Sequence, residues 1–325
     1  MSASRDEMQR AGDRPGRRLG ARYELLEQIG SGGMAVVWRG VTHGAENFRQ
    51  TVAIKRVELE LRGYPEVAAM FVEEARVGTV LRHPNIVQIH DFGVDEDGEP
   101  FLVTEWVDGL ELGQWVTSFA RARIETPWPE LVAIAIEVLR ALDSAHSRLD
   151  ASGRPAPILH RDVTPPNILL DVGGWVKLAD FGMARAMDRG RMTRPNFVKG
   201  KLSYLAPELI LGEMATVQSD LFSLGIVMWE ALAMARLFDG PSDADVVQMV
   251  RDAAVPMLGL RRPNLPLGLT TAVHRALEKD PARRFSSARE MLRALTAVLR
   301  VLPHPVDAPL LAQTVVEGRK RLAAG

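Results

Sequence analysis

The stretch His160-Arg-Asp-Val-Thr-Pro-Pro-Asn167, followed by Asp180-Phe-Gly182, decides how this sequence is interpreted. It places two carboxylates and a carboxamide close together in the chain, among the apolar segments 168–170 and 175–178. Such a set suits a metal–nucleotide site, in which one carboxylate orients a hydroxyl group while the amide and the second carboxylate hold Mg²⁺ through oxygen. The alternative is that these are two unrelated loops. It would require this motif and the two upstream motifs described next to occur in this order along the chain by chance.

Two weaker signals lie upstream. Ile29-Gly-Ser-Gly-Gly-Met-Ala-Val-Val37 lies between two β-rich runs, and its glycines would let backbone N–H groups approach phosphate oxygens. Val52-Ala-Ile-Lys55 places a lysine on the next strand, where its ammonium could neutralise phosphate charge. Taken alone, the first could be a plain hairpin turn and the second a strand with one outward lysine.

The hydrophobic pattern changes along the chain from β-rich to helical. Residues 23–107 predict strands at 23–29, 36–41, 51–57, 86–92 and 101–106 and one helix at 65–82. Helices are then predicted at 128–148, 217–236, 244–251, 269–278 and 286–301. We therefore expect an α+β fold with a small β-rich N-lobe (23–107) and a larger, mostly helical C-lobe (110–300). A flexible leader (1–22) would precede them and a C-terminal tail (301–325) would follow.

The composition excludes several classes of protein. Forty Lys and Arg against forty-one Asp and Glu leave a net charge of −1, so nothing global favours nucleic acid or an anionic membrane. The absence of cysteine excludes disulfide frameworks and thiolate metal sites, and the seven scattered histidines lack the spacing of a zinc site. The leader has no apolar signal segment, and the most apolar stretch, 221–238, contains Glu230 and Arg236. We expect a cytoplasmic protein without a membrane span.

Together these motifs resemble those of the eukaryotic-type protein kinases, specifically the bacterial serine/threonine protein kinases. Three later motifs strengthen the resemblance, which covers roughly 23–300: Ala206-Pro-Glu208, Ser219-Asp220 and Lys279-Asp-Pro-Ala-Arg-Arg284-Phe. The resemblance implies a two-lobed kinase-like fold, with ATP and Mg²⁺ as cofactors and proteins as substrates. The expected reaction transfers the γ-phosphoryl group of ATP to Ser or Thr hydroxyls.

The resemblance also implies a role for each matching residue. Lys55 would contact the α- and β-phosphates and pair with Glu74, because the Glu-Ala step resembles the family at Glu74. The neighbouring Glu73 points about 100° round the helix. Asp162 would be the catalytic base. The ATP-binding residues would be Ile29, Gly30, Ser31, Gly32, Gly33, Met34, Ala35, Val36, Val37, Ala53, Lys55, Glu74, the gatekeeper Thr104, and the backbone of Glu105 and Val107. The Mg²⁺ ligands would be Asn167 and Asp180, and the structural residues Glu208, Asp220 and Arg284, with Glu208 and Arg284 forming a buried pair.

This sequence departs from the family pattern at three positions. Ala35 stands where a third loop glycine is usual, which a negative φ would tolerate. Thr164 stands two residues after Asp162, where serine/threonine kinases usually carry a lysine that meets the γ-phosphate. Gly200-Lys201 stands where the family usually has Gly-Thr. The changes at positions 164 and 201 therefore look like an exchange of lysine and threonine. The alternative is coincidence, but the chain has only six lysines against thirty-four arginines. We therefore count Lys201 among the catalytic residues.

Two other functions compete with an active protein kinase. A pseudokinase that binds nucleotide and partners without turnover is supported only by the missing lysine at position 164. A small-molecule phosphotransferase is disfavoured by the complete segment from Asp180 to Ala206-Pro-Glu208. The sequence leaves the protein substrate, the upstream signal and the oligomeric state open, and without that lysine the preference for Ser/Thr over Tyr is open as well.

One prediction concerns regulation. Arg161 precedes the catalytic aspartate, where an arginine in the family commonly pairs with a phosphate on the activation segment. Thr193 is the only threonine between Asp180 and Glu208, and arginines stand at 189, 191 and 194. A phosphate there would bring about −2 charge and three acceptor oxygens to this basic segment. Mass spectrometry of active protein made with ATP present should find phosphate on Thr193, and an active sample without it would contradict the prediction.

Overall fold

The computed structural model describes residues 12–32, 34–181 and 201–324, and these divide into two compact units. The first unit holds residues 12–82 and 87–107, and the second holds the rest, including the short segment His83–Ile86. Among the described residues, none of the helices has the length and apolar character needed to cross a bilayer.

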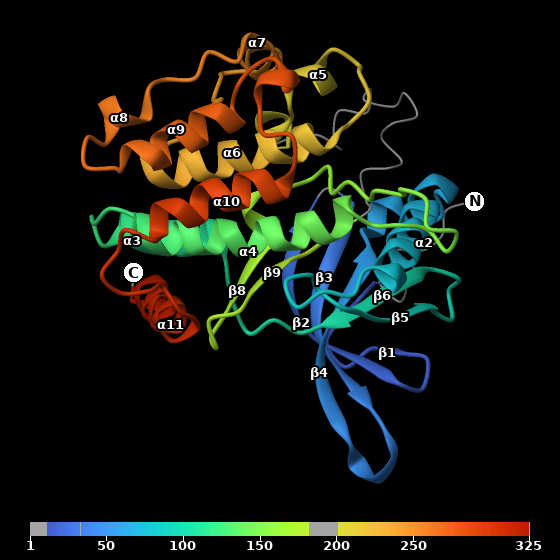
Figure 1. Cartoon of the computed structure of the whole chain (residues 1–325). Helices are drawn as coiled ribbons and strands as arrows, with labels where there is room; N and C mark the ends of the chain where they lie inside the picture. The colour runs from blue at the N-terminus through green and yellow to red at the C-terminus, as the bar shows by residue number, and fades with distance from the viewer. Residues whose placement is uncertain (1–11, 33, 182–200, 325) are drawn as a thin grey trace. The chain divides into compact units, whose positions relative to one another are not determined.

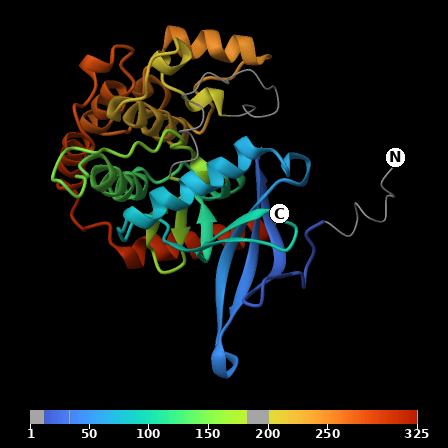
Figure 2. The same ribbon diagram turned by 90° about the vertical axis from the view of Figure 1, so that its right-hand side faces the viewer.

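The first unit is built on a six-stranded antiparallel sheet in the order β1-β2-β3-β4-β6-β5 (Figure 1). Its strands are β1 (Arg18–Leu19), β2 (Tyr23–Gly32), β3 (Ala35–His43), β4 (Arg49–Val57), β5 (Ile89–Val94) and β6 (Pro100–Glu105). The β3–β4 hairpin extends beyond the other strands of its sheet (Figures 1 and 2).

The two faces of this sheet bury different sets of side chains. On one face Ile54 packs with Trp38 and Val103 in a cluster of buried apolar residues. On the other face, helix α2 (Pro65–Val80) packs Phe71 against the sheet, and Figure 2 shows the helix lying across the long strands. Because side chains alternate along a strand, β4 directs Ile54 to the first face and Lys55 to the face that α2 covers.

Part of the expected flexible leader belongs to the fold of the first unit. Leu19 is buried, and its strand β1 pairs with β2. Asp13 lies 3.0 Å from Nε of Arg56, a fully buried arginine whose Nη2 donates to Asp95 at 2.6 Å. A buried guanidinium needs such partners, because an unpaired charge in the interior is costly. Arg56 therefore anchors the segment at Asp13, and the pairing of β1 with β2 anchors it at Arg18–Leu19.

The second unit is mostly helical. Its helices are α3 (Leu112–Arg121), α4 (Trp128–His146), α5 (Pro207–Ile210), α6 (Val217–Ala233), α7 (Asp243–Asp252), α8 (Leu258–Arg261), α9 (Leu267–Ala276), α10 (Ala288–Leu299) and α11 (Ala308–Ala323). A small antiparallel sheet joins β7 (Gly109–Glu111), β8 (Ile168–Asp171) and β9 (Val176–Leu178). Helix α6 is buried over nearly its whole length and contacts α4 and α9. The predicted fold class, a β-rich part with one main helix and a larger helical part, is confirmed.

The ends of several elements differ from the sequence prediction because of local chemistry. Helix α2 ends at Val80, two residues earlier than predicted, and β5 begins at Ile89 instead of residue 86. Helix α10 begins at Ala288 because Ser287 is its N-cap, with Oγ accepting from the N–H of Glu290.

Helix α11 lies in the segment that the sequence suggested was a tail. Its Leu311 and Val315 are buried, and Thr314 accepts a hydrogen bond of 3.1 Å from Nε1 of Trp115 on α3. Trp115 is fully buried and Phe119 nearly so, and the guanidinium of Arg321 lies 5.0 Å from the Phe119 ring. Helix α11 therefore packs on the apolar face of α3.

The substitution Leu311→Ala should test this packing. Truncating a buried leucine commonly costs about 2–5 kcal/mol, so the midpoint of thermal unfolding should fall clearly. The matched control is Val316→Ala on the exposed side of the same helix, which should change the midpoint little. Equal midpoints for both variants would show that α11 does not contribute to the stability of the second unit.

Candidate functional site

The glycine-rich loop connects β2 to β3. Gly32 pairs with Ala35 in the sheet register, so the connection is a tight turn. A Cβ atom built on Gly30 or Gly32 would meet nothing within 4 Å, so packing in the described protein does not require glycine there. Open backbone of this kind suits a ligand that approaches closely, as phosphate oxygens would. Ala35 packs its methyl group in the core beside α2, which accounts for this departure from the family pattern.

The register of the sheet shows which predicted ATP-binding side chains share the face of Lys55. Val37 pairs with Lys55 and Ala53 pairs with Thr104, so these side chains lie on one face. Val36 instead joins the apolar cluster on the opposite face. Among the other predicted loop residues, Ile29 and Ser31 are exposed to solvent, whereas Met34 is buried. Gly33 lies outside the described residues.

Lys55 forms a buried ion pair. Its Nζ donates to Oε1 and Oε2 of Glu74 at 3.0 and 3.2 Å, and both side chains are more than nine-tenths buried. Glu73 lies 4.0 Å from the exposed Arg76 on the same helix. In the structure Lys55 thus pairs with Glu74, and the neighbouring Glu73 faces elsewhere. Losing one partner would leave the other charge buried, so this pair fixes the position of the ammonium.

The segment after Thr104 presents backbone groups. The N–H of Glu105 already donates to the carbonyl of Gln88 at 2.9 Å, and Glu105 Oε1 accepts from the N–H of Gln88 at 2.8 Å. The Glu105 carbonyl accepts from Oγ1 of Thr104 at 3.3 Å, and a carbonyl oxygen has two lone pairs, so it is the backbone group of Glu105 that could meet an adenine amine. Val107 is the last residue of the first unit.

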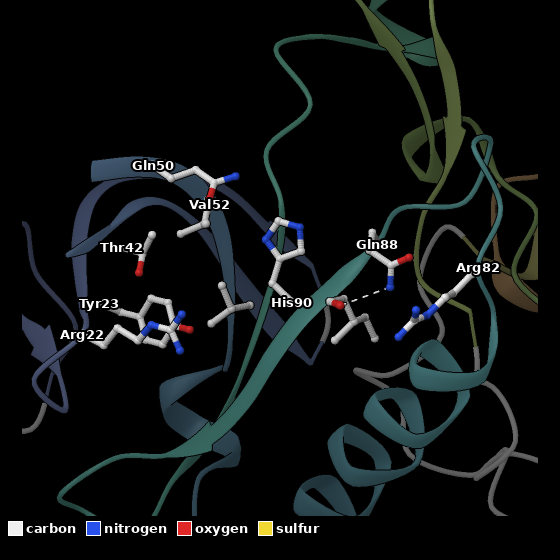
Figure 3. A pocket seen from close by; sticks show the side chains of 10 residues that line it. Arg22, Tyr23, Thr42, Gln50, Val52, Arg82, Gln88 and His90 are labelled. Carbon is white, nitrogen blue, oxygen red and sulfur yellow. Dashed lines mark hydrogen bonds between the residues drawn. The ribbon is translucent and has the colours of Figure 1, made fainter. Parts of the chain in front are cut away.

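A hollow of about 540 Å³ also lies in the first unit (Figure 3). Its wall includes Tyr23, Val52 and Val103, and Figure 3 shows His90 between Val52 and Gln88. Val52 and Val103 belong to the cluster on the face opposite Lys55. The hollow therefore contains none of the predicted nucleotide-binding residues.

In the second unit, Asp220 holds the loop that carries the predicted catalytic residues. Its Oδ2 accepts from the N–H of His160 at 2.9 Å and Oδ1 from the N–H of Arg161 at 2.7 Å. Nε2 of His146 lies 2.8 Å from the same carboxylate. Burial alone would raise the pKa of Asp220, but its partners, led by His146, hold that pKa below its ordinary value. The carboxylate therefore stays charged and stabilises Arg161, whose φ of 66° is in the left-handed region.

His160 is a packing residue. It is fully buried, and its ring meets Phe181 edge-on at 4.4 Å between centroids. Nδ1 accepts from the N–H of Asp162, and Nε2 lies 2.8 Å from the carbonyl of Ala179. This geometry requires a neutral ring with its proton on Nε2, in keeping with burial lowering the pKa of His160.

Asp162 and Asn167 are hydrogen bonded to each other. Nδ2 of Asn167 donates to the backbone carbonyl of Asp162 at 2.8 Å and to its Oδ2 at 3.0 Å. The carbonyl of Asn167 accepts from the N–H of Ala179, which ties this loop to the residue before Asp180. Asp180 has a φ of 65°, a second left-handed residue beside this loop.

This donor set fits a divalent cation. Because the nitrogen of the Asn167 amide is used by Asp162, its Oδ1 remains as the metal-binding end of that side chain. Carboxylate and carboxamide oxygens are the ligands that Mg²⁺ prefers. Asn167 and Asp180 are the residues that the sequence predicts as Mg²⁺ ligands, and the oxygen of Asn167 is suited to that role.

Lys201 reaches the predicted catalytic base. It precedes a short 3₁₀-helix at Leu202–Tyr204, and its Nζ lies 2.5 Å from Oδ2 of Asp162. Its side chain is 43% exposed, whereas that of Asp162 is 8% exposed. Thr164 is buried.

Glu208 and Arg284, which come from two of the later sequence motifs, form a buried ion pair. Nη1 and Nη2 of Arg284 donate to Oε1 and Oε2 of Glu208, each at 2.8 Å. Ser219 donates to the same carboxylate, and the guanidinium lies 4.6 Å from the Phe222 ring. Burial alone would raise the pKa of Glu208, but Arg284 holds it below its ordinary value.

Two residues of the predicted motifs, Thr193 and Gly182, lie outside the described residues.

The structure also contains contacts that the sequence analysis did not predict. Tyr204 donates to Oε2 of Glu230 at 2.6 Å, and Nη1 of Arg236 lies 3.1 Å from that oxygen. Two charges within an otherwise apolar stretch were the available signal for this network. The partnership of His146 with Asp220 had no such signal in the sequence.

A family model described as "Protein kinase domain" matches residues 23–295. Tyrosine-protein kinase MasK of Myxococcus xanthus is 34% identical over 277 residues, covering 85% of this chain and 43% of MasK. Serine/threonine-protein kinase PrkC of Bacillus subtilis is 34% identical over 278 residues (85% of this chain, 40% of PrkC). Serine/threonine-protein kinase PknA of Mycobacterium tuberculosis is 33% identical over 303 residues (91% of this chain, 66% of PknA). The chain thus spans about two fifths of the length of the first two relatives.

A solved structure, the kinase domain of Mycobacterium tuberculosis PknI, aligns with a TM-score of 0.65 and 28% sequence identity. The alignment covers 88% of this chain and 99% of that domain. The chain therefore has the protein kinase fold, as its motifs predict.

The pair Glu208–Arg284 yields a prediction about stability and pH. In the unfolded wild-type chain, Glu208 takes up a proton near its ordinary pKa of 4.5, whereas in the folded protein it stays charged to lower pH. The free energy of unfolding should therefore fall as the pH drops below about 4.5. Glu208→Gln should lower the free energy of unfolding at neutral pH by on the order of 3 kcal/mol and reduce that acid-side slope. Urea unfolding at several pH values, with the exposed Glu213→Gln as control, measures both. An unchanged slope in Glu208→Gln would contradict the assignment.

Proposed function

The chain belongs to the protein kinase domain family, and from this premise we propose that it transfers the γ-phosphoryl group of ATP to serine and threonine hydroxyls of proteins. The observation that carries the proposal is the pair of hydrogen bonds from the Asn167 amide to Asp162. They hold a carboxylate ready to receive a proton and keep an amide oxygen ready for a metal ion.

The proposed reaction is an in-line displacement. The oxygen of the acceptor hydroxyl forms a bond to the γ-phosphorus while the bond from that phosphorus to the β,γ-bridging oxygen breaks, releasing ADP. The hydroxyl proton passes to the carboxylate of Asp162, which also orients the hydroxyl. Asn167 positions Asp162 through both of its hydrogen bonds.

Other residues of the chain would bind the nucleotide. Lys55, fixed by Glu74, would contact the α- and β-phosphates, and the open backbone at Gly30 and Gly32 would donate N–H groups to phosphate oxygens. Mg²⁺ bound by Asn167 and Asp180 would neutralise charge on the phosphates. These groups stabilise charge that develops during transfer, which is the largest contribution to catalysis in such reactions.

Tyrosine is a second acceptor that the relatives bring into consideration. MasK is named a tyrosine-protein kinase, whereas PrkC and PknA are named serine/threonine-protein kinases. We assign serine and threonine as the acceptors because that class predominates among these relatives. The substrates would be proteins, as membership of the protein kinase domain family implies.

Incubation with γ-labelled ATP, Mg²⁺ and a generic protein substrate tests the proposal. Wild type should label the substrate, and hydrolysis of the product should release phosphoserine and phosphothreonine. Asp162→Asn keeps the size of the side chain and should lower kcat by about 10²–10⁴-fold without loss of ATP binding. The control Asp239→Asn, an exposed aspartate, should retain activity.

Three outcomes would contradict the assignment in different ways. ATP binding without transfer in wild type would indicate a pseudokinase. Phosphotyrosine alone in the product would indicate a tyrosine kinase. Labelling of small hydroxyl compounds but of no protein would indicate a small-molecule phosphotransferase.

A further inference from the structure

We propose that Lys201 is a catalytic residue whose ammonium contacts the phosphoryl group during its transfer, in place of a lysine at position 164. The inference rests on the proposed phosphotransfer and names a residue that acts in it. It is carried by the contact between Lys201 Nζ and Asp162 Oδ2, at 2.5 Å.

The contact leaves most of the ammonium's hydrogen-bonding capacity available. An ammonium has three donors, and Asp162 Oδ2 accepts only one of them. Asp162 is nearly buried, whereas the Lys201 side chain is 43% exposed, so the lysine reaches the carboxylate from an accessible side. An anionic oxygen that approaches Asp162 from that side would meet the remaining N–H groups.

Stability alone does not explain this lysine. Ion pairs with an exposed partner contribute little to folding, about 0–1 kcal/mol. The chain also uses arginine for most of its positive charge, with thirty-four arginines and six lysines. An arginine would give Asp162 a bidentate partner, which holds a carboxylate more firmly than a lysine does. A compact, mobile point charge is better suited to a group that changes position during a reaction.

Position 164 is complementary to this arrangement. Thr164 is buried, in extended backbone at the start of the 3₁₀-helix Pro165–Asn167. Its short side chain brings no second charge to Asp162. A lysine there would add another ammonium beside the same carboxylate, and two like charges at close range repel each other. One ammonium at this carboxylate is sufficient, and in this chain Lys201 supplies it.

The position of Lys201 suits the transfer itself. Its Nζ is held beside Asp162 Oδ2, and its other N–H groups can donate to oxygens of the phosphoryl group as the new oxygen–phosphorus bond forms and the bond to ADP breaks.

The test compares Lys201→Ala with Lys320→Ala, which removes an exposed lysine on α11. Lys201→Ala should lower kcat by about 10²-fold while changing the KM for ATP by less than about 3-fold, since the charge matters most in the transition state. Its affinity for ADP should be unchanged, whereas its affinity for ADP with Mg²⁺ and aluminium fluoride, a mimic of the transferring group, should fall by about 10-fold or more. Lys320→Ala should match wild type in every measurement.

An exchange of the two residues gives a second, independent readout. Thr164→Lys alone and Lys201→Thr alone should both be impaired, and the double variant should recover activity to within about 10-fold of wild type. Thermal unfolding of each variant establishes that it is folded.

The outcomes separate the inference from the proposed function. Normal kcat and normal binding of the aluminium fluoride complex in Lys201→Ala would overturn the role of Lys201 alone. Higher activity in Lys201→Ala would also overturn it, because Lys201 would then restrain Asp162. A wild type no more active than Asp162→Asn would refute the proposed phosphotransfer together with this role.

Discussion

The second unit depends on one buried carboxylate, Asp220. It accepts the backbone N–H groups of His160 and Arg161, and His146 supports it from α4. Without it two buried donors would lose their acceptor, and the left-handed backbone at Arg161 would lose the bond that stabilises it. Asp162 follows directly in the chain. The loop that carries the proposed catalytic carboxylate is therefore held by a helix about sixty residues away in sequence.

Buried ion pairs in this protein kinase domain define geometry more than they add stability. Lys55 with Glu74 and Glu208 with Arg284 each join elements that are distant in sequence. Removing charges from water costs about as much as their attraction returns, so such pairs are weak evidence of a stability gain. Their effect is to make other arrangements expensive, because a displaced partner leaves an uncompensated charge. Lys55, which we propose contacts phosphate, thereby keeps a defined position.

The sequence predicted those features that are encoded locally. The family resemblance selected Glu74 over its neighbour Glu73, and the residue pattern at 51–57 predicted the strand that carries Lys55. What remained hidden depends on contacts between distant segments. Asp13 looks like one charge in a solvated leader until Arg56 is seen to be buried beside it. Nothing within 308–323 identifies α3 as its partner, because the matching apolar face belongs to another element.

Family similarity gives misleading limits for an isolated domain of this protein. The family match runs from 23 to 295, yet the folded units extend beyond it at both ends. A fragment trimmed to those limits would leave the guanidinium of Arg56 without Asp13 and would strip the cover from Trp115. Exposed aromatic surface of that kind promotes self-association. Poor solubility of such a fragment would then reflect where it was cut, and would say nothing about the enzyme itself.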